Sequence, residues 1–166
     1  MPPFRCSTTN WGVQLGYDDG ELAVANRDAV EFARVLAEGR PDVTINGVIG
    51  PRGDGYVVGE RMSGEEAAEY HGWQVGVLRE AGAQRMTALT LSYPEEAIGV
   101  VAAAAAVGVP VVPSFTVETN GRLPDGTSIA EVVERVDRDR RGCRFLHDQL
   151  RAPDAHRRRS RRRSCA

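Results

Sequence analysis

The segment RMTALTLSYPEEAIGVVAAAAAVGVPVVPSFTV, residues 85–117, decides the fold. Its first part, Arg85 to Leu91, predicts a β-strand, and the Ala-rich apolar stretch from Pro94 to Val107 predicts a buried helix. A second strand is expected from Pro110 to Val117. Because a helix joins the two strands through short connections, the unit is expected to be a right-handed crossover between parallel strands.

The same alternation extends to both sides of this segment. Asp42 to Ile49 is rich in β-branched residues and predicts a buried strand that ends in the loop Gly-Pro-Arg-Gly-Asp-Gly. Ser63 and Glu66 have the spacing of a capping box and open a helix that is expected to reach Ala81. Further helices are expected at Asn26–Ala37 and at Ser128–Val136. The order of elements predicts the α/β class, with about three to four βα units.

The composition is typical of one globular domain, with 42% hydrophobic and 27% charged residues among 166. The charge is unevenly distributed. Residues 1–137 carry 10 Arg against 20 Asp and Glu, whereas residues 138–166 carry 11 Arg against 3 Asp, and every basic residue is Arg. The chain therefore consists of an acidic part, 1–137, and an irregular basic tail, 138–166.

No segment of the sequence indicates a membrane protein or a secreted one. The longest apolar run, Ala97 to Val112, is shorter than the roughly 20 residues of a membrane helix, and the amino terminus lacks the apolar core of a signal peptide. The three cysteines, Cys6, Cys143 and Cys165, are far apart and predict neither a disulfide framework nor a zinc knuckle. We therefore expect a cytoplasmic protein without a membrane partner.

Candidate site residues follow from the architecture, because ligands of parallel α/β sheets bind beyond the carboxyl ends of the strands. The polar or loop residues at these ends are Gly50, Pro51, Arg52, Gly53, Thr90, Ser114, Thr116 and Glu118. Each of these residues can also simply terminate a strand or cap a helix. The glycines can form a tight loop, and Arg52 and Asp54 can be solvated charges without a ligand. His71, with no carboxylate or cysteine at ligand spacing, is expected to be structural, and Trp11 and Trp73 to be packing residues.

Several short stretches, in this order and spacing, resemble the homocysteine S-methyltransferase family, which includes betaine-dependent and S-methylmethionine-dependent enzymes. The resemblance covers about residues 10–138. The stretches are Ile49–Gly53, Ser63–His71, Ala81–Gly82 before a strand that ends at Thr90, Glu96–Ala97, Ser114–Thr116 and Gly121–Ser128.

The resemblance implies a (β/α)8 barrel that takes a small-molecule thiol and a methyl donor. In this family a zinc ion bound by three cysteines holds the homocysteine sulfur as a reactive thiolate. Since such a barrel needs about 250 residues, residues 1–137 are expected to form a partial barrel, corresponding to about its third to fifth strands. The zinc cysteines are missing, so we expect no bound zinc, no catalytic residue, and an inactive fragment. Its open barrel edges would favour self-association or aggregation.

One residue departs from the family pattern at the end of a strand. The family commonly has Glu-Thr where this chain has Leu89-Thr90. The loss of a carboxylate removes a partner for an ammonium group, which weakens the expectation that homocysteine itself is the substrate.

The basic tail, residues 138–166, has two interpretations. One possible choice of codons for His147 to His156, read one base later, encodes Met-Ile-Asn-Cys-Ala-His-Pro-Thr-His. This peptide contains the Asn-Cys pair of the family. The tail is therefore expected to be out-of-frame sequence. Alternatively the chain is a small α/β binding module whose run Arg157–Arg163 binds a polyanion. No aromatic platform accompanies the run, so specific nucleic-acid recognition is not expected.

Overall fold

The structure is a computed structural model that describes residues 15–139. The tail from residue 140 onward, together with Trp11 and all three cysteines, lies outside the described residues. The described elements are α2 (Asp19–Leu36), β1 (Asn46–Ile49), α3 (Gly64–Glu80), β2 (Arg85–Leu91), α4 (Pro94–Ala106), β3 (Val111–Phe115) and α5 (Ile129–Asp139). No helix within residues 15–139 has the length and apolar character needed to cross a membrane.

The three strands form one parallel sheet in the order β1-β2-β3. Asn46 pairs with Arg85 at the start of β1, and Ile49 pairs with Ala88 at its end. The register between β2 and β3 is irregular between Ala88 and Leu91. The predicted α/β class with parallel βα units is therefore confirmed, although β1 and β3 are shorter than the stretches 42–49 and 110–117 that the sequence predicted.

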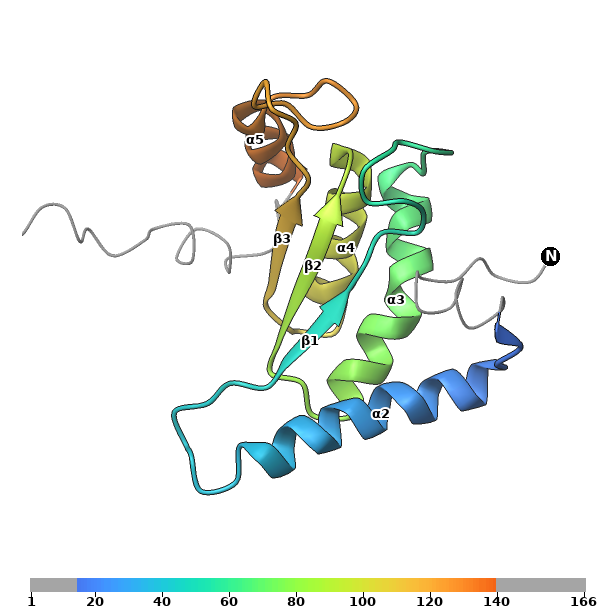
Figure 1. Ribbon diagram of the computed structural model, residues 1–166, viewed down its shortest axis with the longest axis vertical. Helices are drawn as coiled ribbons and strands as arrows, with labels where there is room; N and C mark the ends of the chain where they lie inside the picture. Colours follow the sequence, from blue (N-terminus) through green and yellow to red (C-terminus); the bar gives the residue numbers. More distant parts are fainter. Residues whose placement is uncertain (1–14, 140–166) are drawn as a thin grey trace, which may run out of the picture.

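The helices form one layer against the sheet. Figure 1 shows α3 and α4 behind the strands, α2 across the end at which the strands begin, and α5 beside the end of β3. The fully buried strand residues Ile49, Met86 and Ala88 belong to the same core cluster as Val75 of α3 and Val100 of α4. This layer explains why the segments around 85–106 are the most apolar of the chain.

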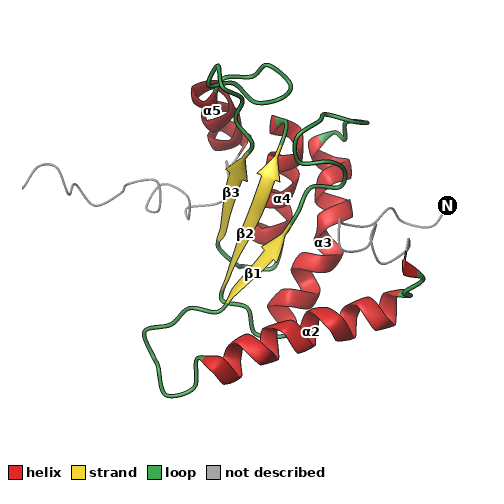
Figure 2. Ribbon diagram, viewed as in Figure 1, coloured by secondary structure: helices red, strands yellow, loops and turns green. Residues whose placement is uncertain are grey.

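No described helix covers the other face of the sheet. Figure 2 shows the yellow strands open toward the viewer. Val48 of β1 is 53% exposed and Leu89 of β2 is 41% exposed, while Gly47, Ile49 and Ala88 beside them are buried. Within residues 15–139 the sheet is thus buried on one face only, as expected for part of a barrel.

Capping boxes fix the starts of two helices. Ser63 accepts a hydrogen bond from the Glu66 backbone, and Glu66 accepts one from the Ser63 backbone, as the sequence predicted. Asp18 and Glu21 make the same reciprocal pair at α2. Because of this second box, α2 begins at Asp19, earlier than the predicted start at Asn26.

Candidate functional site

The loop that follows β1 begins with four of the predicted site residues, Gly50 to Gly53. The backbone N–H of Arg52 donates to Oε1 of Glu96 at 2.7 Å. The Arg52 guanidinium donates to the backbone oxygen of Glu60 at 2.7 Å and lies 6.0 Å from the centre of the Tyr70 ring. The Arg52 side chain therefore contacts other residues of the protein. Pro51 beside it is buried.

Asp54 shapes the tip of the same loop. Its Oδ1 accepts hydrogen bonds from the backbone N–H of Tyr56 at 2.6 Å and of Val57 at 3.2 Å. This turn leaves the side chains of Tyr56 and Val57 exposed. Asp54 thus stabilises the loop conformation.

Gly55 is the point at which the loop meets the other two strand ends. The Thr116 hydroxyl, just after β3, donates to the Gly55 backbone oxygen at 2.5 Å. A Cβ at position 55 would lie 2.7 Å from Oγ1 of Thr90 and 2.8 Å from its Cβ. The structure therefore brings the predicted residues Thr90 and Thr116 together, with a glycine that the sequence did not single out between them.

Thr90 has a strained backbone. Its φ of +53° makes it the one non-glycine residue with positive φ in the described part of the chain. A β-branched residue rarely adopts this conformation, and such strain concentrates at functional sites. Thr90 also lies inside the irregular stretch of the β2–β3 register, between Ala88 and Leu91.

The remaining predicted residues lie along β3 and beyond it. Ser114 is half-buried within β3. Glu118 is exposed in the turn that follows, where its backbone N–H donates to the Arg122 oxygen at 2.8 Å and its backbone oxygen accepts from Gly121. No hydrogen bond among the described residues joins the Glu118 side chain to Thr90 or Thr116.

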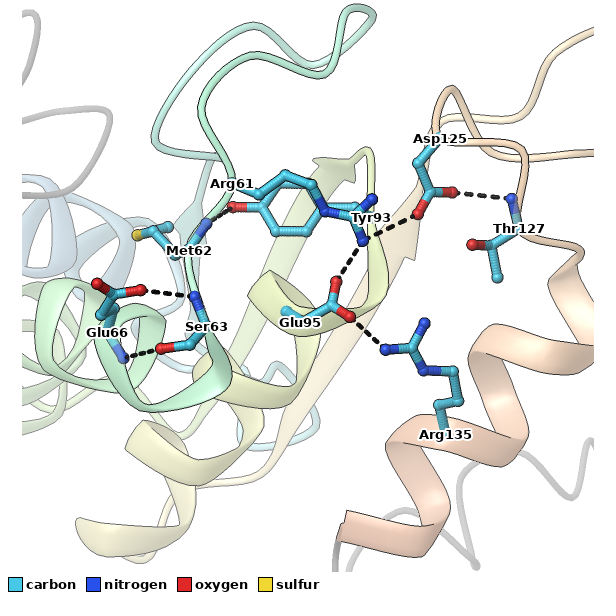
Figure 3. Close-up of polar contacts among 9 residues, drawn as sticks. All are labelled: Arg61, Met62, Ser63, Glu66, Tyr93, Glu95, Asp125, Thr127 and Arg135. Carbon is cyan, nitrogen blue, oxygen red and sulfur yellow. Dashed lines mark hydrogen bonds and ion pairs between the residues drawn. The ribbon is translucent and has the colours of Figure 1, made fainter.

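A second cluster, the ion-pair network of Arg61, Glu95, Asp125 and Arg135, ties the loops at the same end of the sheet (Figure 3). Arg61 lies 2.6 Å from a Glu95 oxygen and 3.3 Å from a buried Asp125 oxygen, and Arg135 of α5 pairs with the other Glu95 oxygen. Sequence reasoning missed the network because its paired residues are separated by 34 to 64 positions and have no motif. The network connects the loops after β1 and β3 to the start of α4.

Tyr93 packs against Arg61 of this network. The Arg61 guanidinium lies 5.1 Å from the centre of its ring, and the Tyr93 hydroxyl accepts from the backbone N–H of Met62 at 3.1 Å. Burial raises the pKa of Tyr93, and the hydrogen bond to Glu95 raises the pKa of Arg61. Partial burial of Glu95 raises its pKa, but hydrogen bonds from Arg61 and Arg135 outweigh this, so that the pKa is lowered overall.

His71 and Glu96 form a buried pair between α3 and α4. Nε2 of His71 lies 3.1 Å from Oε1 of Glu96, and both side chains are almost fully buried. The expected structural role of His71 fits its burial, and the sequence showed no carboxylate at ligand spacing around it. The partner comes from another helix, 25 positions away, where residue spacing along one helix gives no signal.

The described residues do not fit the zinc site that the family resemblance implies. Residues 15–139 contain no cysteine, and no group of three His, Cys, Asp or Glu side chains in that range is placed to hold a metal ion. We therefore assign no metal ligand in this part of the chain.

A cleft of about 360 Å³ lies at the opposite end of the sheet. Its walls come from the end of α2 and from the residues that precede β1 and β2, including Arg34, Val35, Arg40, Val43 and Gln84. The cleft is therefore remote from the strand ends that carry the predicted site.

Comparison with known proteins agrees with this architecture. The homocysteine S-methyltransferase family model matches residues 4–146. No curated protein sequence matches the chain significantly.

Three solved structures of the homocysteine methyltransferase MmuM from Escherichia coli are similar. The oxidized form has 26% sequence identity and a TM-score of 0.66, over 76% of this chain and 48% of MmuM. The metallated form has 23% identity and a TM-score of 0.68, over 83% and 52%. The apo form has 23% identity and a TM-score of 0.62, over 75% and 48%. The chain spans about half the length of MmuM and has the fold of that part, which confirms the predicted partial barrel. The protein belongs to the homocysteine S-methyltransferase family.

Proposed function

We propose that this chain carries the thiol-binding half of a homocysteine S-methyltransferase, an enzyme class that transfers a methyl group from a small-molecule donor to a thiol such as homocysteine. The family match over residues 4–146 carries this proposal. The convergence of Gly55, Thr90 and Thr116 at the carboxyl ends of the strands supports it, because this is where barrels of this kind bind substrate.

The residues at the strand ends have the chemistry to hold a small polar substrate. Gly53 has open space beside its Cα, so that a ligand can approach the loop backbone closely. The hydroxyls of Thr90 and Ser114 can donate to a carboxylate. The Thr116 hydroxyl, by contrast, is used to fix the loop at Gly55.

Leu89 favours a thiol substrate that binds without an ion pair to its ammonium group. It lies on the open face of the sheet, immediately before Thr90, and is 41% exposed. The family resemblance places a carboxylate at this position, and a leucine cannot pair with an ammonium ion. We propose that the substrate is recognised through its sulfur and its carboxylate.

We further propose that the chain alone does not transfer a methyl group. The chemistry of the family needs a zinc-bound thiolate, and the described residues offer no cysteine to bind the metal. We assign no zinc-dependent step to these residues. Their part in the reaction is to bind and orient the thiol.

Calorimetry and a product assay test both parts of the proposal. The chain is titrated with L-homocysteine and with 4-sulfanylbutanoate, which has the same carbon chain without the amino group. We expect both thiols to bind with similar affinity, and no methionine to form when S-methylmethionine or betaine is added with zinc. The variant Arg40→Ala, at the remote cleft, should bind both thiols normally. Absence of thiol binding would contradict the binding role, and methionine formation would contradict the inactivity.

Resequencing the gene across codons 136–166 tests the out-of-frame origin of the tail. A restored frame that reads Asn-Cys and later Cys-Cys would support it, and an unchanged sequence would contradict it. The alternative of polyanion binding depends on Arg157–Arg163, which lie outside the described residues.

We also propose that the isolated chain associates with itself through the open face of the sheet. Val48 and Leu89 expose apolar side chains on that face, and β1 and β3 each have one edge without a partner strand among residues 15–139. Uncovered sheet edges and apolar faces favour association.

A further inference from the structure

We propose that His71 and Glu96 form a positioning pair that fixes the loop after β1 for substrate binding. The consequence for binding depends on the proposed function, whereas the effect on the loop does not. Neither residue was a candidate site residue, and neither reaches the open face of the sheet, since His71 and Glu96 are 0% and 1% exposed.

Glu96 uses a single oxygen to hold two elements. Its Oε1 accepts from the Arg52 backbone N–H at 2.7 Å and from Nε2 of His71 at 3.1 Å. Hydrogen bonds are stronger in the low-dielectric interior of a protein than in water. The loop after β1 is thereby attached to the helix layer through a backbone atom, independently of the Arg52 side chain.

His71 is oriented for this one contact. With Oε1 of Glu96 as the acceptor, Nε2 of His71 is the donor in this contact. Nδ1 is buried and has no hydrogen-bond partner among the described residues. The ring packs edge-on against Tyr70, with centroids 5.0 Å apart and planes at 86°. The histidine therefore acts on the loop through Glu96.

The pair provides one of two anchors on the first part of this loop, residues 52–55. Glu96 holds the Arg52 N–H from α4, and Thr116 holds the Gly55 oxygen from the end of β3. Gly53 and Asp54 lie between these anchors. A shift of Arg52 would move Gly53 and Gly55 relative to Thr90, which touches Gly55. Displacements of about 1 Å can already weaken a site considerably.

Amide hydrogen exchange of the full-length chain tests the positioning. Glu96→Ala leaves the Arg52 N–H without its acceptor, so we expect Arg52 to exchange about ten- to a hundredfold faster. The Met86 amide, which donates to Pro110 across the sheet, should keep its protection. Glu96→Gln retains an acceptor of the same shape and should preserve most of the Arg52 protection.

His71→Leu and a matched control separate positioning from general stability. His71→Leu removes the orienting donor, and we expect faster Arg52 exchange and a loss of thiol affinity of about tenfold. Gln74→Leu removes another buried polar side chain from α3, one that contacts Asn26. It should leave the Arg52 amide unchanged. Equal effects of the two variants at Arg52 would overturn the inference.

The outcomes also separate this inference from the proposed function. If the wild type binds no thiol, the proposed function fails, and a selective loss of Arg52 protection in Glu96→Ala still supports positioning. If the wild type binds thiol but Arg52 stays protected in Glu96→Ala, the positioning inference is wrong. If Glu96→Ala does not fold, the hydrogen exchange of the Arg52 amide in Glu96→Gln and His71→Leu tests the positioning instead.

Discussion

Gly55 is the residue at which the contacts of the three strand ends meet. Its backbone oxygen is bonded by Thr116, and the side chain of Thr90 occupies the space in which a Cβ would lie. Thr90 has its strained positive φ at this same point. A small residue at position 55 is therefore needed for the loop to lie across the strand ends.

Gly55→Ala should displace the loop. The added Cβ would lie 2.7 Å from Oγ1 and 3.2 Å from the backbone oxygen of Thr90, distances that require movement. We expect a loss of stability of about 1–3 kcal/mol and clearly weaker thiol binding by calorimetry. Gly59→Ala, in the same loop with open space around it, is the control. Equal thiol affinities in the two variants would refute this role of Gly55.

The sequence predicted part of this arrangement. Thr90 and Thr116 were placed at one edge because alternating strands and helices put strand ends together. The contact with Gly55 depends on the path of a loop and on an unusual backbone angle, which residue patterns do not encode. Glu96 was noted only as part of the family resemblance, because its bonds to Arg52 and His71 join residues 44 and 25 positions apart.

At the scale of elements, the most extensive contact within residues 15–139 is between α3 and α4. A Cβ on Gly99 of α4 would lie 2.3 Å from the Cβ of Ala67 and 2.6 Å from the backbone nitrogen of Ala68. The two helices thus approach with almost no side chain between them. This packing brings His71 and Glu96 within hydrogen-bonding distance.

Gly99→Ala should separate the helices. Alanine gains up to about 1 kcal/mol in helix propensity, but overpacking at this contact costs about 1–3 kcal/mol or more, so we expect net destabilisation in urea unfolding. Gly76→Ala on α3 has open space around the new Cβ and should be stabilising. An equal or higher stability of Gly99→Ala would contradict the close packing.

The ion-pair network should make stability depend on pH through Glu95. The pKa of Glu95 is lowered in the folded state. Its stabilising contribution is therefore complete above the ordinary glutamate pKa of about 4.3 and is lost as the pH falls through the lower folded pKa. Urea unfolding should show the wild type more stable than Glu95→Gln at neutral pH, with the difference vanishing in acid.

Glu134→Gln, an exposed glutamate on α5, is the control for this measurement. It should leave the pH profile of the wild type unchanged. A constant difference between the wild type and Glu95→Gln at all pH values would show that the charge of Glu95 contributes nothing to stability.

Element boundaries show what the sequence could and could not predict. The bounds of β2 agree with the prediction because it is the central strand, paired with β1 over Arg85–Ala88 and with β3 at Met86–Ala88 and at Leu91. β1 is shorter than predicted, since it begins only at Asn46, where pairing with Arg85 starts. For α2, Gly20 in the first turn obscures the helical pattern in the sequence. The capping box of Asp18 and Glu21 stabilises this end of the helix despite the glycine.

At the scale of the whole molecule, the described chain is one layer of helices on a sheet whose other face is open. The order of the elements predicted parallel βα units, and the family resemblance together with the length of the chain predicted a partial barrel. The exposed Val48 and Leu89 are consistent with that prediction, because both would face inward in a closed barrel. An open face of this kind determines how the isolated chain behaves in solution.

The isolated chain is expected to run above the mass of a monomer in size-exclusion chromatography with light scattering. The double variant Val48→Lys/Leu89→Lys places charges on the open face and should lower the apparent mass. Phe32→Lys replaces an exposed apolar residue on α2 and should not. A monomeric wild type, or equal effects of both variants, would contradict association through the open face.

The location of the thiol site is tested most directly by titrating the isotope-labelled chain with L-homocysteine and following the backbone amide signals by nuclear magnetic resonance. We expect the largest changes at residues 52–55, Thr90 and Thr116, at the carboxyl ends of the strands. Changes centred on Arg40 and Gln84, at the remote cleft, or no changes at all, would contradict a thiol-binding half-site at the strand ends.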